Sequence, residues 1–257
     1  MSLAGAYRTE HGTVLPAVTT EEMREMDHIA VHETGPNLYQ MMENAGRTLA
    51  MTVLSEVTAR SDGPRIVVLA GTGGNGGGGI CAARHLANRS LDVTLCISRP
   101  DDLGEVPAYQ RRVYSGTNGA VVDAEHLASL RAEIVVDAII GYGMTDAPHG
   151  PAGDMIQWAR DQKSAFGARV VSLDVPSGID ATTGDAPGAH ISADVTVALA
   201  LPKAGLHPDS GLSDNVVGSL QLVDLGMPSG LYARFGSLFP FASTYVVSLD
   251  AVGHGRE

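Results

Sequence analysis

The chain has 257 residues, with 29 acidic and 17 basic side chains and a formal net charge of −12. No basic stripe is available to neutralise a phosphate backbone, so we expect no nucleic-acid partner. The apolar runs are shorter than the roughly 20 residues that span a bilayer, and no signal-like segment opens the chain, so no membrane partner is expected. Cys81 and Cys96 lie in apolar segments without a disulfide or zinc pattern, which favours a soluble protein of a reducing, cytoplasmic compartment.

The first sixty residues are predicted to be helical. Thr19 and Glu22 have the spacing of a capping box, which predicts a helix from there to about Glu33. Pro36-Asn37 would end it, and a longer helix follows. Its apolar residues have the spacing of a core-facing stripe, in which the methionines are expected to fill the core: Leu38, Met41, Met42, Ala45, Leu49, Val53 and Val57.

From Arg65 onward, short apolar runs alternate with helical stretches such as 80–88 and 154–166. Runs that are apolar throughout are typical of parallel strands buried on both faces, and the alternation predicts a doubly wound α/β sheet. We expect a single domain over 1–257, with N-terminal helices at 19–60, a core at about 19–228 and a C-terminal tail at 229–257. The expected strands are 66–70, 93–98, 120–122, 134–140, 170–175, 195–201 and 220–225.

Seven of the nine residues at 71–79 are glycine, between the first of these strands and a helix expected to begin near Ile80. Glycine permits positive φ and lets N–H groups approach a ligand, and a helix N-terminus favours phosphate. We therefore interpret the segment as a phosphate-binding loop, with an unliganded turn as the alternative. It also matches the dinucleotide pattern G-x-G-x-x-G, and Arg99 is placed to meet a 2′-phosphate. No tyrosine–lysine pair of a dehydrogenase follows, so an NADP-dependent oxidoreductase is the weaker interpretation.

Three charged residues follow or end strands at the carboxyl edge of the predicted sheet, where ligands bind in such folds. Asp137 lies inside an apolar strand, where a carboxylate must be hydrogen-bonded, paired or on a cation. Asp174 precedes a Pro-Ser-Gly turn and is aimed at the ligand crevice. Lys203, one of only two lysines, ends the next strand, and a lysine has a tunable pKa that arginine lacks. The alternatives are structural: hydrogen bonds that Asp137 accepts from the N–H groups of the following glycine turn, a turn cap for Asp174, and chance for Lys203.

Five segments stand in an order that one family shares: Met42-Glu43-Asn44-Ala45-Gly46-Arg47, 71–79 with Ala82-Ala83-Arg84-His85-Leu86, Asp137 with Gly141-x-Gly143, Asp174-x-Pro176-Ser177-Gly178-Ile179-Asp180, and Pro202-Lys203-x-Gly205. Together they resemble the NAD(P)HX epimerases, the YjeF N-terminal domain family, over about 19–228. The resemblance implies a Rossmann-like three-layer αβα sandwich, usually a homodimer. It also implies an isomerase of nicotinamide-nucleotide repair, which interconverts the R and S forms of hydrated NADH and NADPH. A separate ADP- or ATP-dependent NAD(P)HX dehydratase would then act on the S form.

The resemblance further implies a site. One potassium ion would be held by the oxygens of Asn75, Asp137 and Ser177. We expect Asp174 to protonate the departing hydroxyl and to accept a proton from the returning water, with Lys203 orienting or tuning it. The substrate would contact Gly74, Asn75, Gly76, Gly77, Gly78, Gly141, Tyr142, Gly143, Met144, Thr145, Asp146, Ala147 and Asp174.

Three positions depart from the family pattern. The family loop reads Gly-x-Gly-Asn-Asn-Gly-Gly-Asp-Gly, so Gly74 stands for an asparagine and Gly78 for an aspartate that we expect to accept a hydrogen bond from the substrate. Tyr142 stands for a small threonine. An altered specificity, or a non-catalytic binding or dimerisation module like the decapping scaffolds and the apolipoprotein-binding protein of this fold, is therefore an alternative function.

Overall fold

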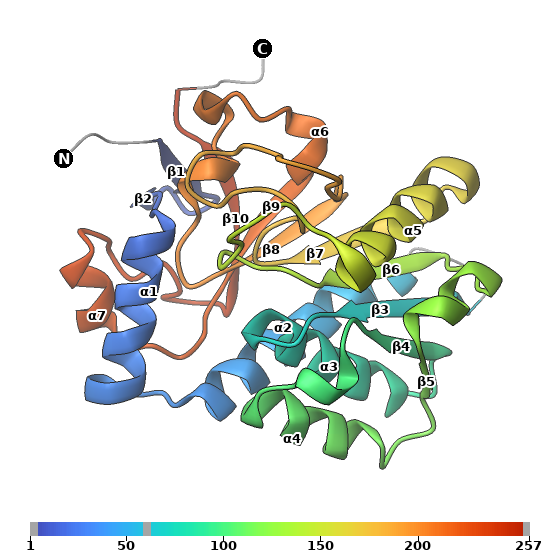
Figure 1. Cartoon of the computed structure of the whole chain (residues 1–257). Helices are drawn as coiled ribbons and strands as arrows, with labels where there is room; N and C mark the ends of the chain where they lie inside the picture. The colour runs from blue at the N-terminus through green and yellow to red at the C-terminus, as the bar shows by residue number, and fades with distance from the viewer. Residues whose placement is uncertain (1–4, 59–62, 254–257) are drawn as a thin grey trace.

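The computed structural model describes residues 5–58 and 63–253. Within these ranges, ten strands form one sheet in the order β2-β1-β10-β9-β8-β7-β6-β3-β4-β5 (Figure 1). Their bounds are β1 Ala6–Thr9, β2 Val14–Pro16, β3 Ile66–Ala70, β4 Val93–Ile97, β5 Ala120–Val122, β6 Ile134–Ala138, β7 Arg169–Leu173, β8 Val195–Leu199, β9 Ser219–Val223 and β10 Val246–Ala251.

Strands β3 to β9 are parallel to their neighbours, and β10, β1 and β2 add an antiparallel edge. The chain runs outward from β3 through β4 to β5, and then returns to lay β6 along the other side of β3. The strand order therefore reverses between β3 and β6. In open α/β sheets the ligand crevice forms at this reversal, outside the carboxyl ends of the strands.

The helices cover both faces of the parallel strands. Figure 1 shows α2, α3 and α4 on one side and α5 on the other, which confirms the predicted three-layer α/β fold. No helix among the described residues has both the length and the apolar character needed to cross a membrane. The bounds are α1 Thr20–Ile29, α2 Leu38–Thr58, α3 Gly74–Ala87, α4 Glu105–Tyr114, α5 Gly150–Phe166, α6 Asp214–Val217 and α7 Ser229–Arg234.

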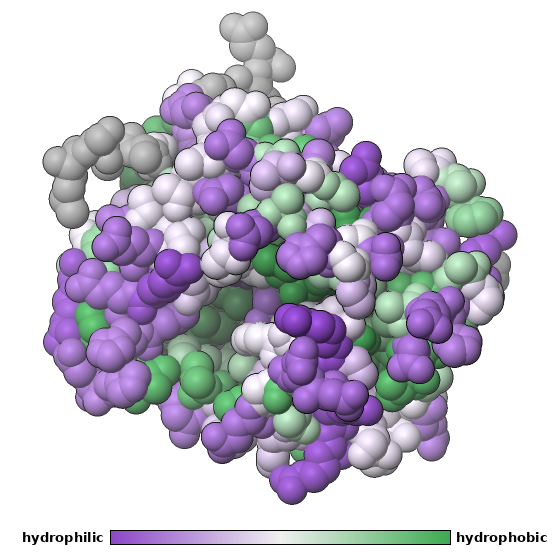
Figure 2. All heavy atoms as spheres, in the orientation of Figure 1, coloured by the Kyte–Doolittle hydropathy of each residue, from purple (hydrophilic) through white to green (hydrophobic). Residues whose placement is uncertain are grey.

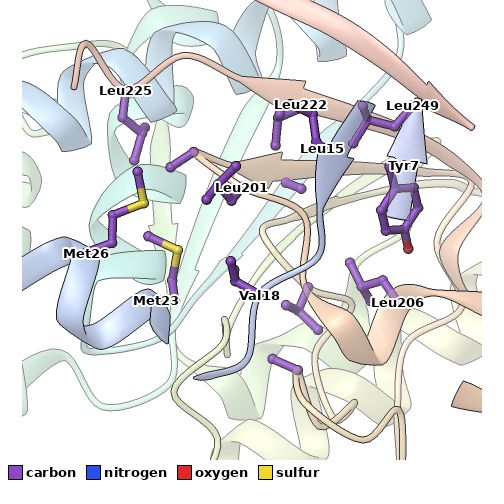
Figure 3. Close-up of a cluster of buried hydrophobic side chains, with 14 of the residues drawn as sticks. Tyr7, Leu15, Val18, Met23, Met26, Leu201, Leu206, Leu222, Leu225 and Leu249 are labelled. Carbon is purple, nitrogen blue, oxygen red and sulfur yellow. The ribbon is translucent and has the colours of Figure 1, made fainter. Parts of the chain in front are cut away.

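Helix α1 begins at the predicted capping box and packs one face into the core. The Thr19 side chain accepts from the Glu22 amide, and the Glu22 carboxylate accepts from the Thr19 amide at 2.8 Å. Met23 and Met26 are buried in an apolar cluster with Leu201 (Figure 3). These contacts fix α1 beside the chain that follows β8.

Several strands end earlier than the apolar runs predict. β6 ends at Ala138 rather than at 140, β7 at Leu173 rather than at 175, and β8 at Leu199 rather than at 201. Asp174 and Ala200 have left-handed backbones, with φ of 69° and 60°. A strand cannot continue through that conformation. The apolar runs extend beyond the strands because the turns themselves are buried.

The sequence prediction missed β1, β2, β10 and α4. The strand β10 lies in the segment expected to be a tail, yet it pairs with β9 on one side and β1 on the other. Residues 246–251 of the expected tail are therefore part of the sheet, which extends beyond the expected core at 19–228. The short strand β1 pairs with β10, a long-range contact that no local pattern predicts, and β2 pairs with β1 in a hairpin.

Candidate functional site

The predicted site residues come together at the carboxyl ends of β3, β6, β7 and β8. The segment at 71–75 follows β3 and the segment at 139–147 follows β6. Asp174 follows β7, and Lys203 lies a few residues beyond β8. Figure 2 shows a hollow on this face, in the region where Figure 1 draws α1, α2 and α3 around the strand ends.

The glycine-rich segment is the beginning of α3 rather than a loop before it. The helix begins at Gly74, not near Ile80, and no glycine from 71 to 79 has a positive φ. Close packing explains Gly71 and Gly76 to Gly79 instead, although not Gly73 and Gly74. A Cβ on Gly76 would lie 1.9 Å from the Gly71 carbonyl oxygen, and one on Gly79 would lie 2.4 Å from the Ala138 Cβ. The predicted reason, left-handed backbone, is therefore wrong. The N–H groups of the first turn of α3 still lack partners within the helix, as an anion site requires.

The two glycines that depart from the family loop have different surroundings. Gly74 is exposed, and a Cβ there would meet only the Met42 methyl group, at 3.8 Å. Gly78 is buried, and its Cβ would lie 2.7 Å from Leu173 Cδ2 and 3.8 Å from Ala45 Cβ. A side chain on Gly78 would therefore begin among apolar atoms, and the missing acid is an interior position rather than an open wall of the crevice.

The Met-Glu-Asn-Ala-Gly motif and the glycine segment are the two sides of one helix crossing. A Cβ on Gly77 would lie 2.3 Å from Met42 Sδ, and one on Gly46 would lie 2.4 Å from Cys81 Cβ and 2.7 Å from the Gly78 carbonyl oxygen. Glycine on both helices lets α2 and α3 approach closely. The crossing holds the N-terminus of α3 at the crevice.

A polar cluster also connects α2 and α3. Glu43, Cys81 and His85 offer potential metal-ligand atoms within 4.8 Å of one another. The guanidinium of Arg84 sits among these atoms, with Nη2 2.5 Å from Glu43 Oε2 and 3.2 Å from Cys81 Sγ, and His85 Nε2 lies 2.8 Å from Glu43 Oε1. Burial opposes ionisation of Glu43, but the His85 hydrogen bond and the Arg84 charge together lower its pKa. Because a cation already neutralises the carboxylate, we interpret the cluster as a clamp between α2 and α3.

Asp137 is fully buried and accepts four hydrogen bonds. Ser177 donates through its amide at 2.9 Å and its hydroxyl at 2.5 Å, Ser172 through its hydroxyl at 2.7 Å, and the Ile139 amide at 3.3 Å. Burial raises the pKa of Asp137, and these hydrogen bonds only partly offset it. The donors come mainly from β7 and the turn after it rather than from the glycine turn at 141–143. The structure thus brings Asp137 and Ser177, two of the expected metal ligands, into direct contact.

Asn75, the third expected ligand, is a buried amide without a protein partner. Among the described residues, neither Oδ1 nor Nδ2 has a hydrogen-bond partner. A Cβ on Gly141 would lie 3.1 Å from Asn75 Oδ1 and 3.0 Å from Asp174 Oδ2, so the amide lies close to the crevice carboxylate. An orphaned buried amide costs free energy unless a ligand or ion satisfies it. Amide, carboxylate and hydroxyl oxygens also fit a hard cation.

Asp174 and Lys203 form a buried ion pair at the crevice. The side chain of Lys203 is 0% exposed and that of Asp174 is 3% exposed, and Lys203 Nζ contacts Asp174 Oδ1 directly. Lys203 Nζ also donates to the Leu199 carbonyl at 2.8 Å, and the Tyr142 amide donates to Asp174 Oδ2 at 3.0 Å. Both carboxylate oxygens are therefore oriented by separate donors. The left-handed backbone of Asp174 turns its side chain into this position.

The segment at 141–147 passes the ion pair and then becomes exposed. Gly143, Thr145 and Asp146 are exposed, whereas Tyr142 is half-buried and its phenol donates to Asp27 Oδ2 at 2.6 Å. Sequence reasoning missed Asp27. The available signal was its spacing, four residues after the buried Met23 and three before the buried Ala30, which places it beside the core-facing side of α1.

Other basic side chains near hollows are already paired. Arg99, expected by the oxidoreductase interpretation to bind a 2′-phosphate, is exposed and lies 3.4 Å from Asp102. A polar groove also runs along the amino ends of β7, β8 and β9. There, Asp194 contacts Lys163 at 3.0 Å and Arg169 at 3.3 Å. The groove lies at the ends of the strands opposite Asp174, and the charges of Lys163 and Arg169 are both paired with Asp194.

Comparisons with known proteins agree with this arrangement. Residues 38–205 match the family model "YjeF-related protein N-terminus". The chain is 44% identical to an NAD(P)H-hydrate epimerase of Dehalogenimonas lykanthroporepellens, over 97% of this chain and 99% of that protein. It is 35% identical to the bifunctional NAD(P)H-hydrate repair enzyme Nnr of Moorella thermoacetica, over 84% of this chain and 41% of that protein.

The fold is also shared with a solved structure. The crystal structure of the yeast protein YNL200c superposes with a TM-score of 0.78 at 23% identity, covering 91% of this chain and all of that one. A likeness at that identity shows the fold alone. The match to the family model and the 44% identity to the Dehalogenimonas protein establish the family. The chain belongs to the YjeF-related protein N-terminus family.

Proposed function

We propose that this chain is an NAD(P)H-hydrate epimerase, which interconverts the R and S forms of hydrated NADH and NADPH. The observation that carries the proposal is the buried Asp174–Lys203 ion pair, set beside the orphaned amide of Asn75 at the reversal of strand order. The names of its relatives, including one that the chain matches over nearly its full length, point to the same activity.

The chemistry needs one proton donor and acceptor at the substrate hydroxyl. The epimerised carbon carries that hydroxyl and is bonded to the ring nitrogen. When an acid protonates the hydroxyl, the nitrogen lone pair forms a C=N bond, and water departs with the electrons of the C–O bond. Water then adds to the other face of the planar ring, the C=N electrons return to nitrogen, and the added water loses a proton. Asp174 can supply the first proton and accept the last one, so no net proton is consumed.

Lys203 supports both states of Asp174. Its ammonium stabilises the carboxylate, and its second contact, to the Leu199 carbonyl, holds Nζ in place when the carboxyl is neutral. Lys203 has no exposed surface, so bulk water does not compete for this contact.

The proposal includes one potassium ion, held by Asn75 Oδ1, Asp137 and Ser177. When bound, the ion would offset the buried charge of Asp137 and satisfy the Asn75 amide. The support is the pair of observations on these residues, a fully buried carboxylate and a buried amide oxygen without a partner. Substrate would be held at the N-terminus of α3 around the exposed Gly74 and by the segment Gly141 to Ala147, whereas the buried Gly78 would not contact it.

The wider setting follows from the reaction. A separate ADP- or ATP-dependent dehydratase would use the S form, and the bifunctional relatives support such coupling. We further propose a homodimer, for which the exposed apolar side chains Leu38 and Met51 of α2 offer surface. A cytoplasmic location is supported by the free thiols of Cys81 and Cys96.

A coupled assay tests the activity. The protein is incubated with R-NADHX, potassium, ATP and a dehydratase that acts only on the S form, and NADH formation is followed by absorbance. An epimerase accelerates NADH recovery in proportion to its concentration. A rate equal to that with dehydratase alone would contradict the proposal and favour a binding module.

A further inference from the structure

Tyr142 joins two parts of the chain that are far apart in sequence. Its phenol donates to Asp27 Oδ2 at 2.6 Å, and thereby ties the segment after β6 to helix α1. Thr20, at the first turn of the same helix, donates from Oγ1 to the Tyr142 carbonyl at 3.3 Å. Two hydrogen bonds thus connect Tyr142 to helix α1, one donated by its phenol and one accepted by its carbonyl.

The same residue contacts both members of the buried ion pair. The Tyr142 amide donates to Asp174 Oδ2 at 3.0 Å. Lys203 Nζ lies 5.8 Å from the centroid of the Tyr142 ring, within the range of a cation–π interaction. Because the amide, the ring and the phenol belong to one side chain and its backbone, moving the phenol moves the other two contacts.

Helix α1 is a firm anchor for this arrangement. Met23, Met26 and Ile29 bury its apolar face, and the Thr19–Glu22 capping box closes its N-terminus. Figure 3 shows Met23 and Met26 pointing into the apolar cluster. Asp27, on the same helix, therefore has a fixed position rather than that of a surface carboxylate.

The charges around Asp27 favour a hydrogen bond at this point. Burial raises the pKa of Asp27, the Tyr142 hydrogen bond and the Lys203 charge lower it, and the Asp174 charge raises it again. Lys203 thus faces two carboxylates, and Arg24 adds a positive charge near the phenol. The phenol lets Asp27 keep a hydrogen-bond donor without drawing Lys203 away from Asp174.

Beyond Tyr142 the segment has little support. In the described part of the chain, the residues at 143–147 make no hydrogen bond to any element outside 141–149. Tyr142 is therefore the last fixed point of the segment before it becomes exposed. The hydrogen bonds that hold Tyr142 on α1 therefore also set the position of the proposed substrate contacts at 143–147.

We propose that Tyr142 and Asp27 form a positioning pair, which holds the Tyr142 amide on Asp174 and the aromatic ring beside Lys203. The inference rests on the proposed epimerase function and assigns helix α1 a part in it. Without the phenol–carboxylate bond, the Tyr142 amide leaves Asp174 Oδ2 more often, and the carboxyl group spends less time oriented for proton transfer. Such a defect lowers turnover more than it weakens substrate binding.

The test compares Tyr142→Phe, Asp27→Ala, which removes the acceptor of the phenol hydrogen bond, and the double variant. Tyr39→Phe is the matched control, because the Tyr39 phenol makes a similar bond, 2.8 Å long, to the Glu105 carboxylate on the exposed surface. We expect each single variant to lower kcat about tenfold with KM changed less than about twofold. The kcat of the double variant should be no lower than that of the worse single variant. Tyr39→Phe should keep wild-type kcat.

Amide hydrogen exchange gives a readout that does not need turnover. Exchange at the Tyr142 amide should quicken in both single variants and stay at the wild-type rate in Tyr39→Phe. Unchanged exchange, a wild-type kcat in both single variants, or losses that multiply in the double variant would each overturn the inference. A wild-type protein without epimerase activity, but with faster Tyr142 exchange in the variants, would contradict the proposed function alone. Should Asp27→Ala fail to fold, Tyr142→Phe carries the test, since it keeps the ring and removes one oxygen.

Discussion

Lys203 Nζ contacts Asp174 Oδ1 across 29 positions of sequence, and neither side chain has appreciable contact with solvent. The two residues follow adjacent parallel strands, β7 and β8, so the sheet brings them together. A buried charge pair of this kind contributes little to stability by itself but is costly to break. Its position at the crevice is better explained by chemistry than by folding.

The two lysines of the chain give a matched test of this pair. Lys203→Met leaves Asp174 buried without its cation, which is expected to cost about 3–5 kcal/mol of unfolding free energy and to abolish turnover. Lys163→Met removes a half-exposed contact to Asp194 and should cost less than about 1 kcal/mol. Urea denaturation measures both. Equal losses of unfolding free energy in Lys203→Met and Lys163→Met would show that the buried pair is no more costly to break than the surface pair.

Potassium should stabilise the folded protein through Asn75. When the potassium concentration is about 100 times the Kd, the bound ion adds about 2.7 kcal/mol to the free energy of unfolding. This corresponds to a rise in Tm of about 5–10 °C. Asn75→Ala should abolish the rise, while Asn118→Ala, at an exposed position, should retain it. Thermal scans in potassium chloride and in choline chloride of equal ionic strength make the comparison. A rise that persists in Asn75→Ala would rule out this ligand.

Restoring the family residues at the two departing glycines should have opposite outcomes. Gly74→Asn places its side chain in open space and is expected to change stability by less than about 0.5 kcal/mol. Gly78→Asp drives a charged group against Leu173 and should cost about 1–3 kcal/mol or more. Their Tm values, measured side by side, test whether position 78 is interior. A Gly78→Asp variant with the Tm of wild type would show that position 78 faces the crevice.

The Glu43 clamp predicts a specific pH dependence. The folded protein lowers the pKa of Glu43, so below its ordinary value of 4.5 the unfolded chain binds more protons and stability falls as pH falls. Glu43→Gln should cost about 0.5–1 kcal/mol at neutral pH, since water screens this half-exposed pair. This difference in unfolding free energy from wild type should shrink as the pH falls below 4.5.

The control for the clamp is Glu125→Gln, an exposed carboxylate on the surface. It should match wild type at every pH in the same urea titrations. If the difference in unfolding free energy between Glu43→Gln and wild type stays constant as the pH falls below 4.5, the carboxylate charge is not what joins α2 to α3.

The parallel part of the fold could be read from the sequence because its signals are local. The runs at 66–70 and 120–122 and the Thr19–Glu22 capping box appear in the structure at the predicted residues. The strands β1 and β10 could not be predicted, because their pairing joins the two ends of the chain, and β2 is a three-residue edge strand paired only with β1. Short edge strands carry almost no periodic signal of their own.

The candidate site was predictable in its residues but not in its connections. Asp137, Asp174 and Lys203 stood out as polar groups at the ends of apolar strands, and the sheet gathers them at one edge. The reason for the glycines was not predictable, because their packing against α2 depends on tertiary contacts. Asp27 was missed since nothing in its own helix indicates that Tyr142, 115 residues away, supplies its hydrogen bond.

The central claim is that this chain epimerises hydrated nicotinamide cofactors through Asp174. The most direct measurement follows the R and S forms of NADHX by chiral chromatography, starting from the pure R form, with wild type, Asp174→Asn and the exposed-surface control Asp161→Asn. Wild type and Asp161→Asn should reach the same R–S mixture quickly, and Asp174→Asn should be slower by about 10²–10⁴-fold while remaining folded. Full epimerisation by Asp174→Asn, or none by wild type, would contradict the claim.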